Sequence, residues 1–138
     1  MINKGNERKI KFTIPCQSKE IGDSVEKIIS GVEKIDSDIF DIKFRVEMVA
    51  REMLANAIGH GCDGREGIIK IELEVYIDQI KLKVKDPGKG FDYENIDLIS
   101  NSFLGEGGRG LAMIKKGADR VEFNETGNTI TAFFKVSE

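Results

Sequence analysis

Three polar residues recur at four-residue intervals in the segment EMLANAIGHG, residues 52–61. They are Glu52, Asn56 and His60, which supply a carboxylate, a carboxamide and an imidazole, all of them groups that exchange hydrogen bonds or protons. Residues four apart share one side of a helix, and this row runs beside an apolar stripe. It is therefore placed to line a cavity at the edge of the core. A solvated helix face with a capping histidine is the alternative interpretation.

A second candidate is the segment DPGKGFD, residues 86–92, which directly follows a strand pattern. Asp86 ends that pattern, and an aspartate at a strand end that faces a pocket accepts a hydrogen bond from an exocyclic amine. Gly88 and Gly90 allow backbone conformations and close ligand approaches that other residues resist. A surface turn would explain the same residues, so this segment has little specificity on its own.

The third candidate is the glycine-rich segment GEGGRGLAMI, residues 105–114, which leads into an apolar helix pattern. Free backbone amides at a helix start form a natural cradle for phosphate, and Arg109 supplies a counter-charge. The segment is not a Walker loop, because no G-K-[ST] follows, and it lacks a Rossmann setting. The alternative is a flexible glycine hinge.

The elements that must position these residues alternate along the chain. Period-two alternation predicts strands, and apolar residues at helical spacing predict helices. The predicted strands are 9–15, 67–77, 79–86, 119–125 and 128–136, and the predicted helices are 19–34, 42–59 and 109–117. Strands that follow one another as hairpins predict an α+β fold: a two-layer sandwich with a mixed, mostly antiparallel sheet and helices on one face.

Local signals set the expected ends of these elements. Ser18 is a candidate N-cap for the first helix, and Asp41 opens the second, which Gly59 and Gly61 are expected to stop. The first hairpin is expected to turn at Asp78-Gln79 and the last at Gly127-Asn128.

Composition limits the class of protein. The chain has 138 residues and a net charge of -3, which favours a single domain over residues 1–138 without a general attraction to nucleic acid or anionic membrane. No secretory signal or membrane-spanning run is visible. With two cysteines, Cys16 and Cys62, outside any CxxC pair, we expect a cytoplasmic protein with reduced thiols and no disulfide.

Taken together, the three segments resemble the GHKL (histidine-kinase-like) ATPase superfamily, and within it the bacterial anti-sigma factor serine/threonine protein kinases. REMLANAIGHG resembles the family's N box, DPGKGFD its first glycine box, and GGRGLAMIKKGADRVEF its second. The resemblance covers nearly the whole chain. It implies the α/β sandwich of that superfamily, of the Bergerat type, with ATP held between the helices and a lid.

Carried over by position, the resemblance also implies roles for single residues. Asn56 would be the Mg²⁺ ligand and Glu52, one turn earlier, the general base that activates an attacking hydroxyl. Asp86 would bind the adenine amine. Gly88 and Gly90 would shape the purine pocket. The lid and the phosphate cradle, with Arg109 as the counter-charge, would be formed by Gly105, Gly107, Gly108 and Gly110. Glu106 departs from the family, which often has a basic residue there.

Two functions follow as expectations. The first is a kinase that uses ATP and Mg²⁺ to phosphorylate an anti-anti-sigma (STAS) protein, and that otherwise sequesters a sigma factor. The second is a non-catalytic module in which ATP binding only controls partner binding. Glu52 favours the kinase, since a pure binder does not need a base. The resemblance also implies a homodimer, with no nucleic-acid or membrane partner.

Overall fold

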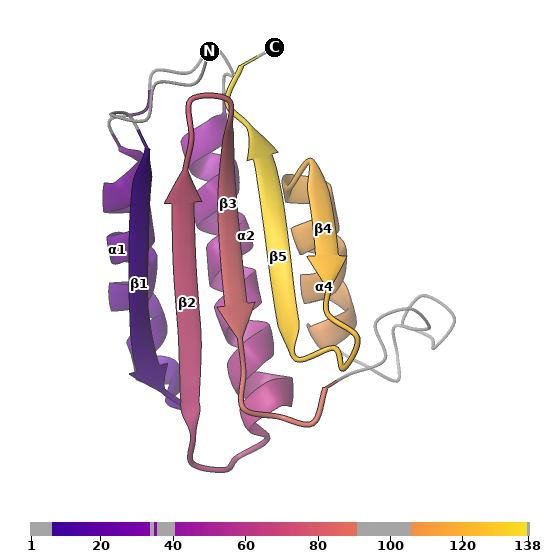
Figure 1. Ribbon diagram of the computed structural model, residues 1–138. Helices are drawn as coiled ribbons and strands as arrows, with labels where there is room; N and C mark the ends of the chain where they lie inside the picture. The colour runs from indigo at the N-terminus through magenta and orange to yellow at the C-terminus, as the bar shows by residue number, and fades with distance from the viewer. Residues whose placement is uncertain (1–6, 34, 36–40, 91–105, 138) are drawn as a thin grey trace.

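A computed structural model describes residues 7–33, 35, 41–90 and 106–137 of the chain. Its elements follow the order that the periodicities predict (Figure 1). They are β1 (Arg8–Pro15), the 3₁₀ turn η2 (Ser18–Glu20), α1 (Ile21–Val32), α2 (Ile42–Asn56), the π-helical segment η3 (Ala57–Cys62), β2 (Ile68–Val75), β3 (Gln79–Lys85), α4 (Glu106–Gly117), β4 (Arg120–Phe123) and β5 (Thr129–Lys135).

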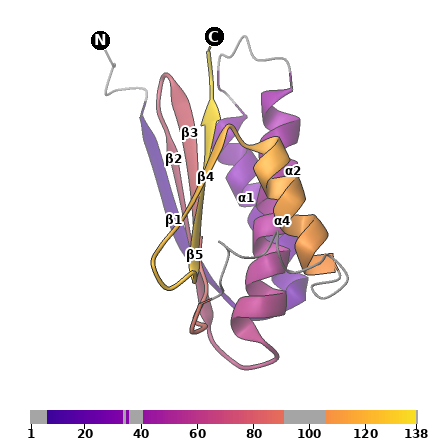
Figure 2. The ribbon, with the colours of Figure 1, turned by 90° about the vertical axis from the view of Figure 1, so that its right-hand side faces the viewer.

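The strands form one five-stranded sheet in the order β1-β2-β3-β5-β4. Every pairing within it is antiparallel. Helices α1, α2 and α4 all lie against the same face, so the described chain has two layers (Figure 2). The predicted α+β sandwich with helices on one face is confirmed, and the sheet is antiparallel throughout the part that the structure describes.

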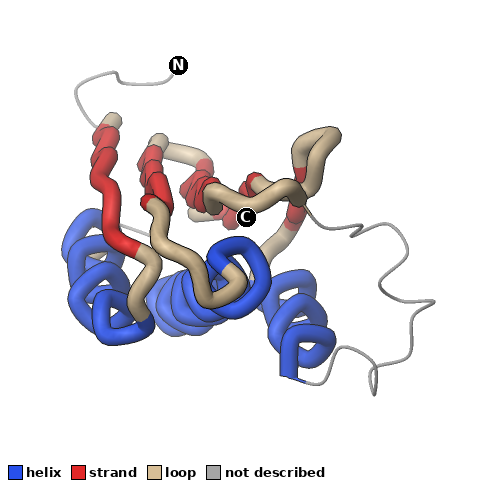
Figure 3. Tube along the Cα trace, turned by 90° about the horizontal axis from the view of Figure 1, so that it is seen from below, coloured by secondary structure: helices blue, strands red, loops and turns tan. Residues whose placement is uncertain are grey.

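The alternation of buried and less buried side chains along the central strands explains why the helices lie on one face of the sheet. In β2, Ile69, Ile71 and Leu73 are fully buried, while the charged residues between them are not. Since successive side chains of a strand point to opposite faces, one face of the sheet is apolar and must be covered. The helices cover it from below the strands (Figure 3), and α2 lies in the middle of the helical layer.

Helix α4 crosses α2 at close range near its own C-terminal end. A Cβ atom at Gly117 would lie 2.5 Å from a methyl group of Val49, so only glycine fits at this crossing. Arg45 of α2 donates a hydrogen bond from Nη1 to the Gly117 carbonyl at 2.9 Å. It also pairs with Asp41 at 3.0 Å and with Asp119 at 3.8 Å. These contacts fasten the end of α4 to the start of α2.

The expected N-cap of the first helix and both expected hairpin turns are wrong. Ser18 is not a helix cap but lies in η2, whose N-cap is Gln17. The first hairpin turns at positions 77 and 78, because the N–H of Tyr76 donates to the carbonyl of Gln79 at 2.8 Å. The last hairpin has a longer loop than Gly127-Asn128: the side-chain oxygen of Asn124 accepts from the N–H groups of Gly127 and Thr129 across it.

The expectation of two reduced thiols is also wrong for this structure. Cys16 and Cys62 form a disulfide, with their Cα atoms 5.9 Å apart and 46 positions apart in sequence. The N–H of Cys16 donates to the Gly67 carbonyl at 3.1 Å, which holds the end of β1 beside the segment that follows η3. Spacing along the chain gave no sign of this proximity, because sheet pairing creates it.

The disulfide should contribute measurably to stability. A cross-link that closes a loop of this length restricts the unfolded chain, and about 2–4 kcal/mol is the usual stabilisation. We expect the double variant Cys16→Ser, Cys62→Ala to lose that much free energy of unfolding in urea titrations, relative to the oxidised protein. Adding dithiothreitol should bring the native chain close to the variant. Equal urea midpoints for the oxidised protein and the variant would contradict this prediction.

Candidate functional site

The polar row lies at the C-terminal end of α2 and in η3. Glu52 is half-buried, Asn56 is buried and His60 is exposed. Gly59 and Gly61 do not end the helix as expected. It continues as a π-helix to Cys62, and the chain then turns at Asp63, which has a left-handed φ of 50°. π-helical turns are rare and occur often at functional sites.

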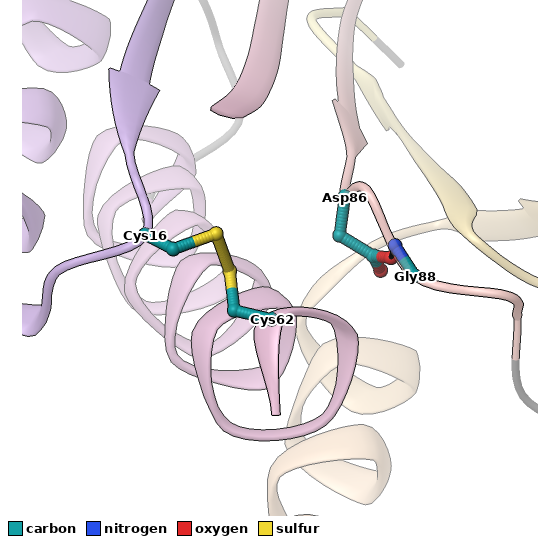
Figure 4. Close-up of a disulfide and its surroundings, with 4 residues drawn as sticks. All are labelled: Cys16, Cys62, Asp86 and Gly88. Carbon is teal, nitrogen blue, oxygen red and sulfur yellow. Dashed lines mark hydrogen bonds between the residues drawn. A yellow bond between two sulfur atoms is a disulfide. The ribbon is translucent and has the colours of Figure 1, made fainter. Parts of the chain in front are cut away.

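At the end of β3, Asp86 occupies the position that the sequence predicts for it. It is 8% exposed, and its Oδ1 accepts a hydrogen bond from the N–H of Gly88 at 2.7 Å (Figure 4). Burial raises the pKa of the Asp86 carboxyl above its ordinary value, and the Gly88 N–H lowers it in part. A buried carboxylate with acceptor positions to spare is suited to a ligand that donates a hydrogen bond.

Glycine is required where η3 meets this strand end. A Cβ atom at Gly61 would lie 2.1 Å from Cγ of Asp86, and one at Gly88 would lie 2.6 Å from the Gly61 carbonyl oxygen. The backbone of η3 therefore contacts the Asp86 side chain directly. This contact joins the predicted N box to the predicted first glycine box.

Gly90 is required for a different reason. Its φ is +103°, which side-chain-bearing residues rarely adopt, and a Cβ there would overlap the Thr126 carbonyl oxygen at 1.5 Å. The N–H₂ group of Asn128 reaches the carbonyl of Gly88 at 3.3 Å. The segment after β3 thus packs on the loop between β4 and β5.

The glycines before the last helix do not form a loop. α4 begins at Glu106, so Gly107, Gly108, Arg109 and Gly110 lie in its first turns, whereas the sequence predicts a helix from 109. Glycine costs about 1 kcal/mol relative to alanine inside a helix, which is why the pattern resembled a loop. Buried Leu111 and Ile114 anchor the helix through packing instead.

This helix start lies beside the catalytic candidate. A Cβ atom at Gly110 would be 2.9 Å from Oε2 of Glu52, so the carboxylate of α2 contacts the backbone of α4. The first amides of a helix have no partner inside the helix and favour anions. Gly110 is the fifth residue of α4, so the Glu52 carboxylate lies about one helical turn after those first amides.

A cavity of about 170 Å³ opens between η3, the end of β3 and the β4–β5 loop. Its lining residues are His60, Gly61, Asp63, Arg65, Asp86, Gly88, Lys89, Gly90 and Gly127. Small-molecule sites usually measure about 300–1,000 Å³. This cavity is therefore smaller than a usual site for a whole small-molecule ligand.

The predicted site residues fall into two groups. Asp86, Gly88 and Gly90 line the cavity together, whereas Glu52 lies against Gly110 and is not part of that lining. Asn56 is one helical turn after Glu52 and one turn before His60, which belongs to the cavity. Gly105 lies outside the described residues.

Sequence reasoning missed two basic residues of the lining, Arg65 and Lys89. Lys89 stands between the two glycines of the predicted first glycine box, and that position was the available signal. Arg65 had no comparable signal, since it comes from an irregular loop after η3. Both give the cavity positive charge beside Asp63 and Asp86.

The residues fit one Mg²⁺ held jointly with a ligand. Among the described residues, no group of three or more His, Cys, Asp and Glu side chains could hold a metal alone. Mg²⁺ is usually bound through one or two protein oxygens plus phosphates and water. The amide oxygen of Asn56 is a suitable protein ligand for that arrangement.

Comparisons with known proteins show the family to which the chain belongs. Residues 16–134 match the model of the histidine kinase-like ATPase domain. The serine-protein kinase RsbW of Staphylococcus aureus, in strains JH9, Newman and JH1, is 31% identical over 133 residues, which cover 88% of this chain and 83% of the relative. None of the described helices has the length and apolar character needed to cross a bilayer.

Proposed function

The chain belongs to the family of histidine kinase-like ATPase domains, and from this we propose that residues 1–138 act as one ATP- and Mg²⁺-dependent protein-serine/threonine kinase domain. Its substrate is a serine-bearing protein of the anti-anti-sigma (STAS) class, and in the absence of transfer it sequesters a sigma factor. The observation that carries the proposal is the contact of the Glu52 carboxylate with Gly110 in the second turn of α4.

We propose separate roles for the residues that bind adenine, phosphate and metal. Asp86 accepts a hydrogen bond from the adenine amine, while Gly61, Gly88 and Gly90 leave room for the ring. The first amides of α4 and Arg109 bind the phosphates. Bound Mg²⁺ supplies charge neutralisation at the phosphate oxygens, and Asn56 contributes one ligand to it.

Glu52 is the proposed general base. Its carboxylate is half-buried at the junction of α2 and α4, where a hydroxyl that approaches the phosphate end of the site would meet it. Removing the proton of that hydroxyl assists its attack on the terminal phosphate. Positioning and charge stabilisation then carry most of the rate effect, as in other phosphoryl transfers.

A direct assay tests the proposal. The protein is incubated with labelled ATP, Mg²⁺ and a STAS protein, and the label is followed to a serine of that partner. Transfer supports the kinase. Partner binding that depends on ATP without any transfer would favour the non-catalytic module, which needs Asp86 and the glycines but not Glu52.

The metal role of Asn56 gives a separate prediction. Asn56→Ala should weaken nucleotide binding in the presence of Mg²⁺ by on the order of tenfold, or about 1.4 kcal/mol, because one metal ligand is lost. Binding without Mg²⁺ should change little. Calorimetric titrations with Mg²⁺ and with EDTA measure both values. A loss by the same factor in the two buffers would show that Asn56, which is 8% exposed, acts through packing.

A further inference from the structure

One of the two cysteines of the chain, Cys62, lies between Gly61 and Asp63, which both line the proposed adenine pocket. The sequence has no others. Cys16 follows directly after β1, and Cys62 is the last residue of η3, immediately after Gly61. Figure 4 shows the bridge between them on the side of η3 that faces β1, with Asp86 and Gly88 on the side toward β3.

From the Cys62 side, the bridge fixes a segment that contacts Asp86. Gly61 precedes Cys62, and its backbone lies so close to Asp86 that a Cβ atom would be 2.4 Å from Oδ2. The Gly61 carbonyl also packs on Gly88. A shift of η3 therefore changes the space on two sides of the Asp86 carboxylate.

On the Cys16 side, a second series of contacts leads to the turn after β3, which contains Pro87. Cys16 donates its N–H to the Gly67 carbonyl at 3.1 Å. A Cβ atom at Gly67 would lie 2.7 Å from Cγ of Pro87 and 3.4 Å from Sγ of Cys16. Pro87 lies between Asp86 and Gly88. Residues adjoining each cysteine, Gly61 beside Cys62 and Gly67 beside Cys16, therefore contact the turn after β3.

We propose that the Cys16–Cys62 pair is a thiol–disulfide exchange site that sets the nucleotide affinity of the Asp86 pocket. The oxidised pair holds η3 and the turn after β3 in the packed arrangement described above. Reduction releases η3 from β1 and weakens nucleotide binding. This inference rests on the proposed function, since it takes the Asp86 cavity as the adenine site.

The reducing partner is a dithiol, either a small molecule or a protein. Its thiolate attacks Sγ of Cys16, because Cys16 is partly exposed whereas Cys62 is 2% exposed. The Cys16–Cys62 bond breaks, a mixed disulfide forms, and Cys62 leaves as a thiolate that takes up a proton. The second thiol of the dithiol then displaces Cys16. Two electrons and two protons pass to the protein, and the dithiol becomes a disulfide.

Thermodynamic linkage gives the expected size of the redox effect on nucleotide affinity. It also requires a reciprocal effect of the nucleotide on reduction of the disulfide. Couplings between sites are typically about 5- to 150-fold. If oxidation tightens nucleotide binding by a given factor, bound nucleotide must make the disulfide harder to reduce by the same factor. Two independent measurements therefore have to return one number.

The first measurement is ADP affinity of the native chain by calorimetry, oxidised and after dithiothreitol. We expect weaker binding after reduction, by at least about fivefold, with unchanged far-ultraviolet circular dichroism. The double variant Cys16→Ser, Cys62→Ala is the matched control, and dithiothreitol should not alter its affinity. Equal affinities of the two native forms, or a response of the variant to the reductant, would overturn the inference.

The second measurement is the redox equilibrium itself. The fraction of free thiols is determined by maleimide labelling over graded ratios of reduced to oxidised dithiothreitol, with and without ADP. We expect ADP to shift the midpoint toward more reductant by the same factor as in calorimetry. No shift, although the oxidised protein binds ADP, would refute the redox control and leave the proposed function standing. Absence of ADP binding in both forms would refute both.

Discussion

Replacing Glu52 by glutamine is expected to slow phosphate transfer from ATP to a serine-bearing STAS protein by about 10²–10⁴-fold, the usual effect of losing a positioned general base. Glutamine keeps the size and shape of glutamate but cannot take the proton. Binding of Mg²⁺ and ATP should stay close to native, because the proposed adenine acceptor Asp86 and the proposed metal ligand Asn56 are both unchanged. Single-turnover transfer assays and calorimetry measure the two quantities separately.

Glu47→Gln is a matched control on the same helix. Glu47 is exposed and pairs with Arg51 at 3.7 Å on the surface, and such pairs contribute little to stability. This variant should transfer phosphate at the native rate. Native-level transfer by Glu52→Gln would remove the base assignment.

Replacing Asp86 by alanine is expected to weaken ATP and ADP alike, by roughly 10- to 150-fold, since a hydrogen bond to a charged group contributes about 1.5–3 kcal/mol. GTP should bind poorly to the native protein, because it carries a carbonyl where ATP carries the amine. Calorimetry with the three nucleotides measures this. Glu66 is exposed and does not line the cavity, so the control variant Glu66→Ala should bind normally. Equal native affinities for ATP and GTP would contradict the assignment.

The same carboxyl gives binding a pH dependence with a defined sign. Burial raises the pKa of Asp86, and an amine that donates to it favours the ionised form. Nucleotide affinity should therefore fall as the pH drops through the pKa of Asp86, beginning at a higher pH than an ordinary aspartate would require. His60, Asp63, Arg65 and Lys89 also line the cavity, so the comparison is the native protein against Asp86→Ala, which should lose the acid-side fall.

Much of the fold could be predicted because its signals are local. Alternation in 67–77 and 79–86 predicted β2 and β3, and the helical stripe after Asp41 predicted α2, whose N-cap is Asp41. Burial of one face of a strand or helix shows in the sequence as a regular spacing of apolar residues. The same logic placed Asp86 at a strand end, where the structure has it.

The predictions that proved wrong concern features that depend on contacts between segments distant in sequence. The disulfide depends on β1 pairing with β2, and no spacing rule reports that geometry. α4 starts early because Leu111 and Ile114 pack into the core and override the weak helix propensity of its glycines. η3 continues past Gly61 because its backbone there packs against Asp86, a contact that only glycine allows.

The fastening of α4 by Arg45 has a mechanical consequence. Arg45 holds the carbonyl of Gly117 at one end of a helix of 12 residues, and such a helix is roughly 18 Å long. The proposed phosphate-binding amides are at the opposite end. A change of about 10° in the angle between α2 and α4 would carry them by roughly 3 Å, which is the length of a hydrogen bond. A slight tilt of α4 about Gly117 would therefore decide whether these amides contact a phosphate group.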